Sequence, residues 1–103
     1  MKKIILAVAL ISSTSAFACL DQAVRVFGQE MQARRHENIH VYPQSTKVPA
    51  GQTFETYGTV FSYDFDVEIF EGTSEFMSGF GVEAIVMDPK DCSLIDLVQV
   101  YAE

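Results

Sequence analysis

Residues 61–70, FSYDFDVEIF, alternate between apolar and polar side chains along almost their whole length. Because successive side chains of a β-strand point to opposite faces, this pattern predicts one long strand with an apolar face and an acidic face. At about 3.3 Å per residue such a strand would measure roughly 30 Å, so its apolar face needs a large covering element. The apolar face would consist of Phe61, Tyr63, Phe65, Val67 and Ile69, and the acidic face of Asp64, Asp66 and Glu68.

The covering element is predicted at residues 20–35. Leu20, Val24, Phe27 and Met31 recur at helical spacing and form one apolar stripe, with Ala23 beside it. A helix from Leu20 to about residue 35 would measure roughly 24 Å, close to the length of the predicted strand. We therefore expect this helix to lie across the apolar face of residues 61–70.

The rest of the chain predicts antiparallel strands joined by polar turns. Pro43 would end a short strand around Ile39 and Val41, and residues 43–52 have the composition of a loop. Gly58 is compatible with either a bulge or a turn between two strands. The other expected elements are a weak strand at Thr53–Tyr57, a turn at Glu71–Ser74, strands at Glu75–Met87 and Leu94–Ala102, and a turn at Asp88–Asp91. One helix followed by these strands predicts an α+β fold, with the helix packed across a curved antiparallel sheet of about four strands.

Residues 1–18 have the three parts of a secretory signal peptide. Lys2 and Lys3 form a positively charged start, an apolar run follows, and Ala16-Phe17-Ala18 is a small-residue cleavage site. We expect cleavage after residue 18, a single domain at residues 19–103 and a periplasmic or secreted location. Lipoprotein anchoring at Cys19 is a less favoured alternative, because residues 16 and 17 do not follow the usual aliphatic-then-small pattern.

Cys19 and Cys92 are the only two cysteines of the sequence, and an oxidising compartment would join them in a disulfide. Closing a loop of that length would stabilise the fold by roughly 4 kcal/mol in the chain-entropy model. Because so small a domain buries a limited core, we expect the disulfide to be essential for stability.

Acidic residues dominate the predicted mature chain. Without Lys2 and Lys3 it carries five basic and fourteen acidic residues, a net charge of −9. Such a charge repels phosphate backbones and anionic lipids, so neither nucleic acid nor a membrane surface is expected as a partner. No second apolar run is long enough for membrane insertion. The charge favours a protein or a cationic peptide as partner.

The segment HENIH at residues 36–40 matches the HExxH pattern of zinc proteases. On a helix the two imidazoles lie one turn apart and can share one zinc ion. Here the apolar stripe fades after residue 31 and residues 39–41 alternate like a strand, on which the two imidazoles would lie about 13 Å apart. We interpret both histidines as solvated and keep a zinc site as the alternative. That site would use His36 and His40 as ligands, Glu37 as general base, and Glu55 or Glu68 as third ligand.

The acidic positions of residues 61–70 also suggest calcium, because Glu75 stands twelfth counted from Asp64. An EF-hand loop needs glycine at its sixth position, where this chain has Ile69. We therefore expect no cofactor, with zinc and calcium as less favoured possibilities. The acidic positions are better explained as a solvated face that docks a cationic partner. The possible partner face consists of Asp64, Asp66 and Glu68, with Glu55 and Glu83 as neighbours.

A second set of apolar residues lies out of phase with the expected core. Exposed together, these residues would exceed the scattered apolar side chains of an ordinary surface and mark an interface. Otherwise the expected register is wrong by one residue, or residues 43–52 cover the set. Its members are Phe70, Met77, Ile85 and Met87, with Phe54 as a possible fifth.

Three features of layout recur in a known group of proteins. Cys19 stands directly before the first helix, an antiparallel sheet follows, and Asp91-Cys92 precede a last strand that ends in Val100-Tyr101-Ala102. In this layout the chain resembles the small periplasmic cystatin-like proteins of the colicin M immunity type. The resemblance implies a cystatin-like roll and a one-disulfide, non-enzymatic protein that binds another protein.

Taken together, these features favour a small secreted or periplasmic binding protein that inhibits or sequesters a protein partner. One alternative is a minimal zinc-dependent hydrolase that uses His36–His40. The other is a structural protein that self-associates through its apolar outer face. The sequence favours the binding protein over an enzyme, and it leaves the oligomeric state open.

Overall fold

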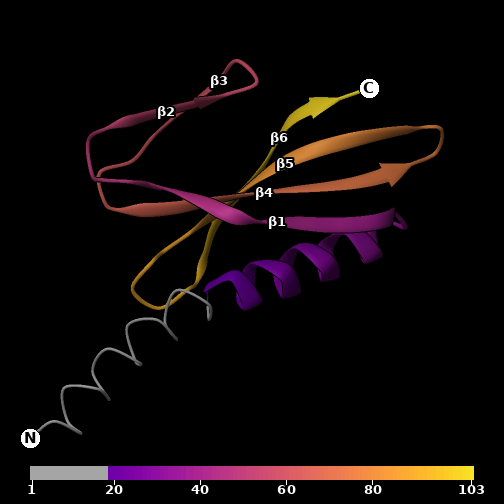
Figure 1. Ribbon diagram of the computed structural model, residues 1–103, viewed down its shortest axis with the longest axis horizontal. Coiled ribbons are helices and arrows are strands. Elements are labelled where there is room, and N and C mark those ends of the chain that lie inside the picture. The colour runs from indigo at the N-terminus through magenta and orange to yellow at the C-terminus, as the bar shows by residue number, and fades with distance from the viewer. Residues whose placement is uncertain (1–18) are drawn as a thin grey trace, which may run out of the picture.

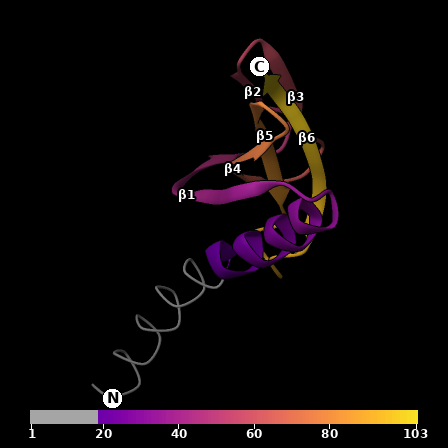
Figure 2. The same ribbon diagram turned by 90° about the vertical axis from the view of Figure 1, so that its right-hand side faces the viewer.

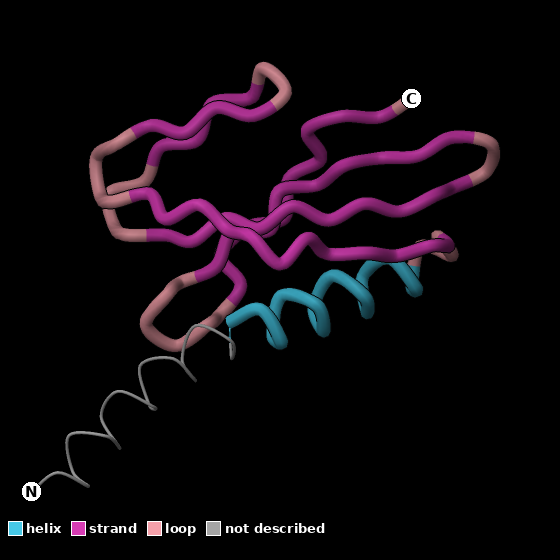
Figure 3. Tube along the Cα trace, in the orientation of Figure 1, coloured by secondary structure: helices cyan, strands magenta, loops and turns pink. Residues whose placement is uncertain are grey.

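The computed structural model describes residues 19–103 (Figure 3). Within this range a helix occupies residues 19–33 and six strands follow it. The strands are β1 (Glu37–Val48), β2 (Thr53–Thr56), β3 (Thr59–Ser62), β4 (Val67–Phe76), β5 (Gly79–Met87) and β6 (Leu94–Ala102). The predicted α+β class is confirmed, and so is a helix packed on a four-stranded antiparallel sheet. The predicted signal peptide, residues 1–18, lies outside the described residues.

Each face of the four-stranded sheet packs against another element. Its strand order is β1-β4-β5-β6, and all neighbours are antiparallel. The helix lies across one face, and the β2–β3 hairpin folds over part of the other (Figures 1 and 2). Neighbouring residues of β4 therefore enter different cores: Ile69 packs on the hairpin side and Phe70 on the helix side.

Two hydrophobic cores result from this three-layer arrangement, and the sheet separates them. The helix-side core contains Cys19, Ala23, Phe27, Met31, Val41, Phe70, Ile85 and Met87. The hairpin-side core contains Val48, Phe61, Val67, Ile69, Val82, Ala84, Val86 and Val100. A strand that is buried on both sides carries apolar residues at both parities, so alternation along it does not tell which side the helix covers.

The single long strand expected at residues 61–70 is wrong. β3 ends at Ser62, residues 63–66 form an irregular connection, and β4 begins at Val67. The two strands belong to different sheets, yet Phe61 and Val67 both enter the hairpin-side core, one from each layer. The alternation of apolar and polar residues continues across the break between β3 and β4, because Phe61 and Val67 enter the same core from its two opposite sides. The helix therefore covers the face of β4 that carries Phe70. The prediction had placed the helix over the opposite face, which carries Val67 and Ile69.

The turn expected at Glu71–Ser74 is also wrong, because β4 continues through these residues to Phe76. The chain turns at residues 77–78 instead, which divides the strand expected at Glu75–Met87. Gly72 lies against the ring of Phe27 in the helix. Its lack of a side chain serves close packing of the helix on the sheet, a role that composition cannot distinguish from that of a turn glycine.

The apolar set that was out of phase does not form an exposed patch. Phe70, Ile85 and Met87 are fully buried under the helix, and Phe54 is half-buried against the hairpin-side core. Met77 alone of the set is fully exposed, at the β4–β5 turn. Val82, Ala84 and Val86, which the prediction placed in the core, are buried as well, on the hairpin side. Both sets of apolar positions therefore face a core, and self-association loses the surface on which it was based.

The loop expected at residues 43–52 is wrong over most of its length, because β1 runs to Val48. β1 is an edge strand, so Pro43 can sit within it although proline has no N–H group to donate. The register with β4 shifts between Val41 and Ser45, around this proline. A bulge of this kind also protects an open sheet edge against pairing with another chain.

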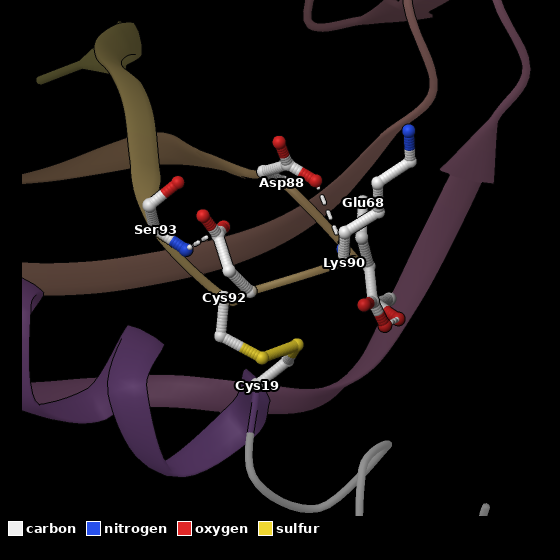
Figure 4. The surroundings of a disulfide bond; sticks show 8 residues. Cys19, Glu68, Asp88, Lys90, Cys92 and Ser93 are labelled. Atoms are coloured by element: carbon white, nitrogen blue, oxygen red, sulfur yellow. Dashed lines mark hydrogen bonds between the residues drawn. A yellow bond between two sulfur atoms is a disulfide. The ribbon is translucent and has the colours of Figure 1, made fainter.

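The predicted disulfide between Cys19 and Cys92 is confirmed, and the two Cα atoms lie 4.9 Å apart. It joins the helix to the β5–β6 connection (Figure 4). Two aspartate side chains stabilise the turns of this connection by accepting hydrogen bonds from the backbone. Asp88 Oδ1 accepts the N–H of Lys90 at 2.9 Å, and Asp91 Oδ1 accepts that of Ser93 at 3.0 Å. The bond occupies the sulfur atom that lipidation of Cys19 would require.

Over residues 19–103, the helix lacks the length and apolar character needed to cross a membrane.

Candidate functional site

The three acidic residues predicted as a partner face do not lie together on one exposed face. Asp64 and Asp66 belong to the irregular connection at residues 63–66, where Asp66 Oδ1 accepts the N–H of Ala50 at 2.9 Å. Glu68 lies on β4, is only 5% exposed and accepts a hydrogen bond from the hydroxyl of Ser45. Asp66 and Glu68 therefore have structural partners, and Asp64 alone is left for docking.

Glu83, expected as a neighbour of that face, lies under the end of the helix instead. Its Oε2 accepts a hydrogen bond from Nη1 of Arg34 at 3.2 Å, while Nε of Arg34 contacts Glu30 at 3.0 Å. Burial raises the pKa of Glu83 above its ordinary value, and the charge of Arg34 opposes this increase. The ion pair ties the helix to β5. Glu55, the other expected neighbour, is exposed on β2.

The HExxH segment is not helical. The helix ends at residue 33 and β1 begins at residue 37, so the geometry that this motif requires is missing. His36 Nδ1 lies 2.8 Å from Ser74 Oγ, and the ring of His36 stacks on Phe76 with centroids 4.8 Å apart. His40 is exposed and meets Tyr42 edge-on. Across residues 19–103, no three His, Cys, Asp or Glu side chains are grouped to hold a metal ion.

A cleft of about 370 Å³ opens where the β2–β3 hairpin folds over the large sheet, and we call it the hairpin cleft. Tyr42 of β1, Phe54 of β2 and Tyr57 of the hairpin turn give it three aromatic walls. Glu71 of β4 contributes a carboxylate, whose Oε2 accepts a hydrogen bond from Thr56 Oγ1 at 3.1 Å. The remaining lining residues are Gln44, Ser45, Thr46 and Ile69.

Tyr57 occupies an unusual backbone position at the edge of this cleft. Tyr57 and Gly58 form a two-residue turn between Thr56 and Thr59, with φ values of 51° and 80°. Such a type I′ turn favours Asn or Gly at its first position, and another residue there costs about 1 kcal/mol. Yet Tyr57 is 55% exposed, so burial does not offset this strain. Strained backbone positions cluster at functional sites, which makes Tyr57 a candidate contact residue.

Tyr57 also begins a row of exposed aromatic side chains, which we call the aromatic row. Its ring centroid lies 5.5 Å from that of Tyr101 on β6, and Tyr101 lies 5.8 Å from Phe80 on β5. The hydroxyl of Tyr101 donates to Glu103 Oε2 at 3.2 Å, and this hydrogen bond raises the pKa of the phenol above its ordinary value. The cleft and the row share Tyr57 and thus form one continuous surface.

Sequence reasoning missed both features. The sequence predicts Phe80 and Tyr101 on two separate strands and carries no sign that their side chains share a surface. One local signal was available: the pair Tyr57-Gly58 between alternating segments has the glycine of a hairpin turn but an aromatic residue where asparagine is typical.

No family model matches this chain, and neither any curated protein nor any solved structure shows a significant similarity to it. Its function therefore has to be inferred from its own geometry and charge.

Proposed function

We propose that this chain is a small binding protein that acts by protein–protein interaction, as an inhibitor or by sequestration. The hairpin cleft and the aromatic row form its contact surface. The observation that carries the proposal is Tyr57, a strained and exposed aromatic residue at the junction of the two. Tyrosine and phenylalanine supply large contact areas at low entropic cost, and both are enriched where proteins meet.

The secreted or periplasmic location belongs to the same proposal. It is supported by the disulfide between Cys19 and Cys92, since such bonds persist in oxidising compartments. The cystatin-like layout also belongs to it, and the helix that lies across an antiparallel sheet supports this layout. Within the group that the chain resembles, binding to another protein is the expected mode of action.

Affinity capture with matched surface variants tests this function. The oxidised protein, a Phe80→Ser/Tyr101→Ser variant and a Val24→Ser control are immobilised and exposed to proteins of the native compartment. Val24 is an apt control because it is 49% exposed but lies on the helix, across the sheet from the aromatic row. We expect the same proteins on the wild type and the control, and their loss from the double variant.

Circular dichroism establishes that all three proteins are folded before capture. Equal retention of the captured proteins by the double variant and the wild type would exclude the aromatic row as the contact surface.

A further inference from the structure

We propose that the hairpin cleft binds a cationic side chain of the partner, above all the guanidinium group of an arginine. This inference rests on the proposed function and specifies the ligand of the same surface. Three observations support it: the aromatic walls of the cleft, the carboxylate of Glu71 and the distribution of basic residues over the chain.

The walls suit a cation with a flat or apolar body. Tyr42, Phe54 and Tyr57 surround the cleft from three different elements of the fold. The faces of aromatic rings carry negative electrostatic potential and attract ammonium and guanidinium groups placed over them. The volume of about 370 Å³ is at the small end of the range of ligand sites, which fits one long side chain better than a folded surface.

Glu71 supplies the charge that makes the cleft selective for cations. An ionised carboxylate can accept about four hydrogen bonds, and the structure shows one, from Thr56, within the described residues. Free acceptor positions remain for the ligand. A guanidinium group presents paired N–H donors in a fixed plane that matches a carboxylate, whereas an ammonium group acts as a point charge.

Among residues 19–103, no basic side chain lines the hairpin cleft to neutralise Glu71. Arg25 and Arg34–Arg35 belong to the helix or directly follow it, on the opposite face of the sheet, and Arg34 is engaged by Glu30 and Glu83. Neither Lys47 nor Lys90 lines the cleft. Because the whole chain is acidic, with a net charge of −7, long-range attraction of a cationic segment supports the local complementarity.

Peptide titration followed by NMR tests the assignment. The probe is a short capped peptide of glycine and serine with one central arginine; matched peptides carry lysine or the neutral isostere citrulline at the centre. We expect the amide signals of Tyr42, Phe54, Tyr57 and Glu71 to shift with arginine. The dissociation constant should be about tenfold larger with citrulline, which retains the shape but lacks the charge. The lysine peptide should bind with intermediate strength.

Three variants separate local recognition from general attraction. Glu71→Gln should weaken binding of the arginine peptide about tenfold, because it removes the charge within the cleft. Glu55→Gln removes one charge from the exposed side of β2 and should leave the dissociation constant nearly unchanged. Tyr57→Asn retains a favourable turn residue but removes one aromatic wall, and should weaken binding about threefold.

Equal affinity for the arginine and citrulline peptides overturns the inference. Equal losses of affinity for the arginine peptide in Glu71→Gln and Glu55→Gln also overturn it, because they would reveal non-specific attraction of the peptide to an acidic protein. Failure here is distinct from failure of the proposed function. If captured proteins still depend on Phe80 and Tyr101 but not on Glu71, the binding function stands without the arginine site. If capture does not depend on Phe80 and Tyr101 but the arginine peptide still binds the cleft, the arginine site stands and the aromatic row is excluded as the contact surface.

Discussion

The ring of Phe27 in the helix fills the space that a side chain on Gly72 would occupy in β4. A Cβ atom added to Gly72 would lie 2.6 Å from Cε2 of that ring, well inside van der Waals contact. Gly72 does not have a positive φ, so the ring and not the backbone conformation demands glycine there. The pair sets how closely the helix approaches the sheet.

We expect Gly72→Ala to destabilise the protein by about 1–3 kcal/mol, because the extra methyl group forces Phe27 or the helix to move. Urea unfolding measures the loss. The matched control is Gly28→Ala on the same helix, where an added Cβ meets nothing within 4 Å. That change should stabilise the protein by about 0.5–1 kcal/mol through helix propensity. Two substitutions of equal size would thus shift the unfolding midpoint in opposite directions.

Tyr57→Asn should raise the stability of the protein by about 1 kcal/mol, because asparagine adopts the positive φ of this turn more readily than tyrosine. Thermal or urea unfolding of the free protein measures the gain. The same variant is expected to bind the arginine peptide more weakly, so stability and binding should change in opposite senses. A loss of stability would show that the ring of Tyr57 contributes more through packing than the turn costs.

The pH dependence of stability should reflect Glu83. Its pKa is raised in the folded state, so between the ordinary value of about 4.5 and the raised value the folded protein binds more protons than the unfolded chain. Stability that depends on this group is therefore present at low pH and falls as pH rises through that window. Glu83→Gln should remove this component, which urea unfolding at several pH values detects.

In that experiment Glu55→Gln controls for the loss of one negative charge, since Glu55 is exposed on β2. The wild type and Glu55→Gln should give parallel curves of stability against pH, and Glu83→Gln should diverge from both. If all three curves are parallel, burial of Glu83 has no energetic consequence for folding.

Removal of the disulfide by Cys19→Ala/Cys92→Ala should cost roughly 4 kcal/mol in the chain-entropy model, since the bond spans a sequence separation of 73 residues. Unfolding in urea with and without a reductant measures this loss. The reductant should weaken the wild type by a similar amount and leave the double variant unaffected. A reductant effect on the double variant would point to a cause other than this bond.

Local signals in the sequence predicted the parts of the fold that depend on local interactions. Of the predicted stripe, Phe27 and Met31 are fully buried against the sheet, with Ala23 beside them. Val24 of the same predicted stripe is 49% exposed, so the buried face of the helix is rotated toward Ala23. The disulfide followed from the presence of two cysteines in a chain with a predicted signal peptide. The turn around Asp88–Asp91 followed from residues whose side chains bond to nearby backbone N–H groups.

The sheet could not be predicted in the same way, because each of its faces packs against another element. Ile69 and Phe70 are adjacent and equally apolar, and only the three-dimensional arrangement determines that one meets the hairpin and the other the helix. Residues 61–70 kept their alternation across a break between two sheets. The hairpin cleft was missed for a related reason: it brings together residues from β1, β2 and β4, which pattern analysis treats separately.

The position of the disulfide also determines what proteolysis can do to this protein. The bond closes a covalent ring from Cys19 to Cys92 that contains the helix and β1–β5, while β6 lies outside it. A protease that nicks a hairpin tip inside the ring leaves both fragments attached until the bond is reduced. A cut between Cys92 and Leu94 removes the covalent link to β6 and to Tyr101 of the aromatic row, and non-covalent contacts, such as the pairing with β5 and the packing of Val100, then hold the strand. The C-terminal strand is thus the one strand of residues 19–103 that a single cleavage can detach covalently from the oxidised protein.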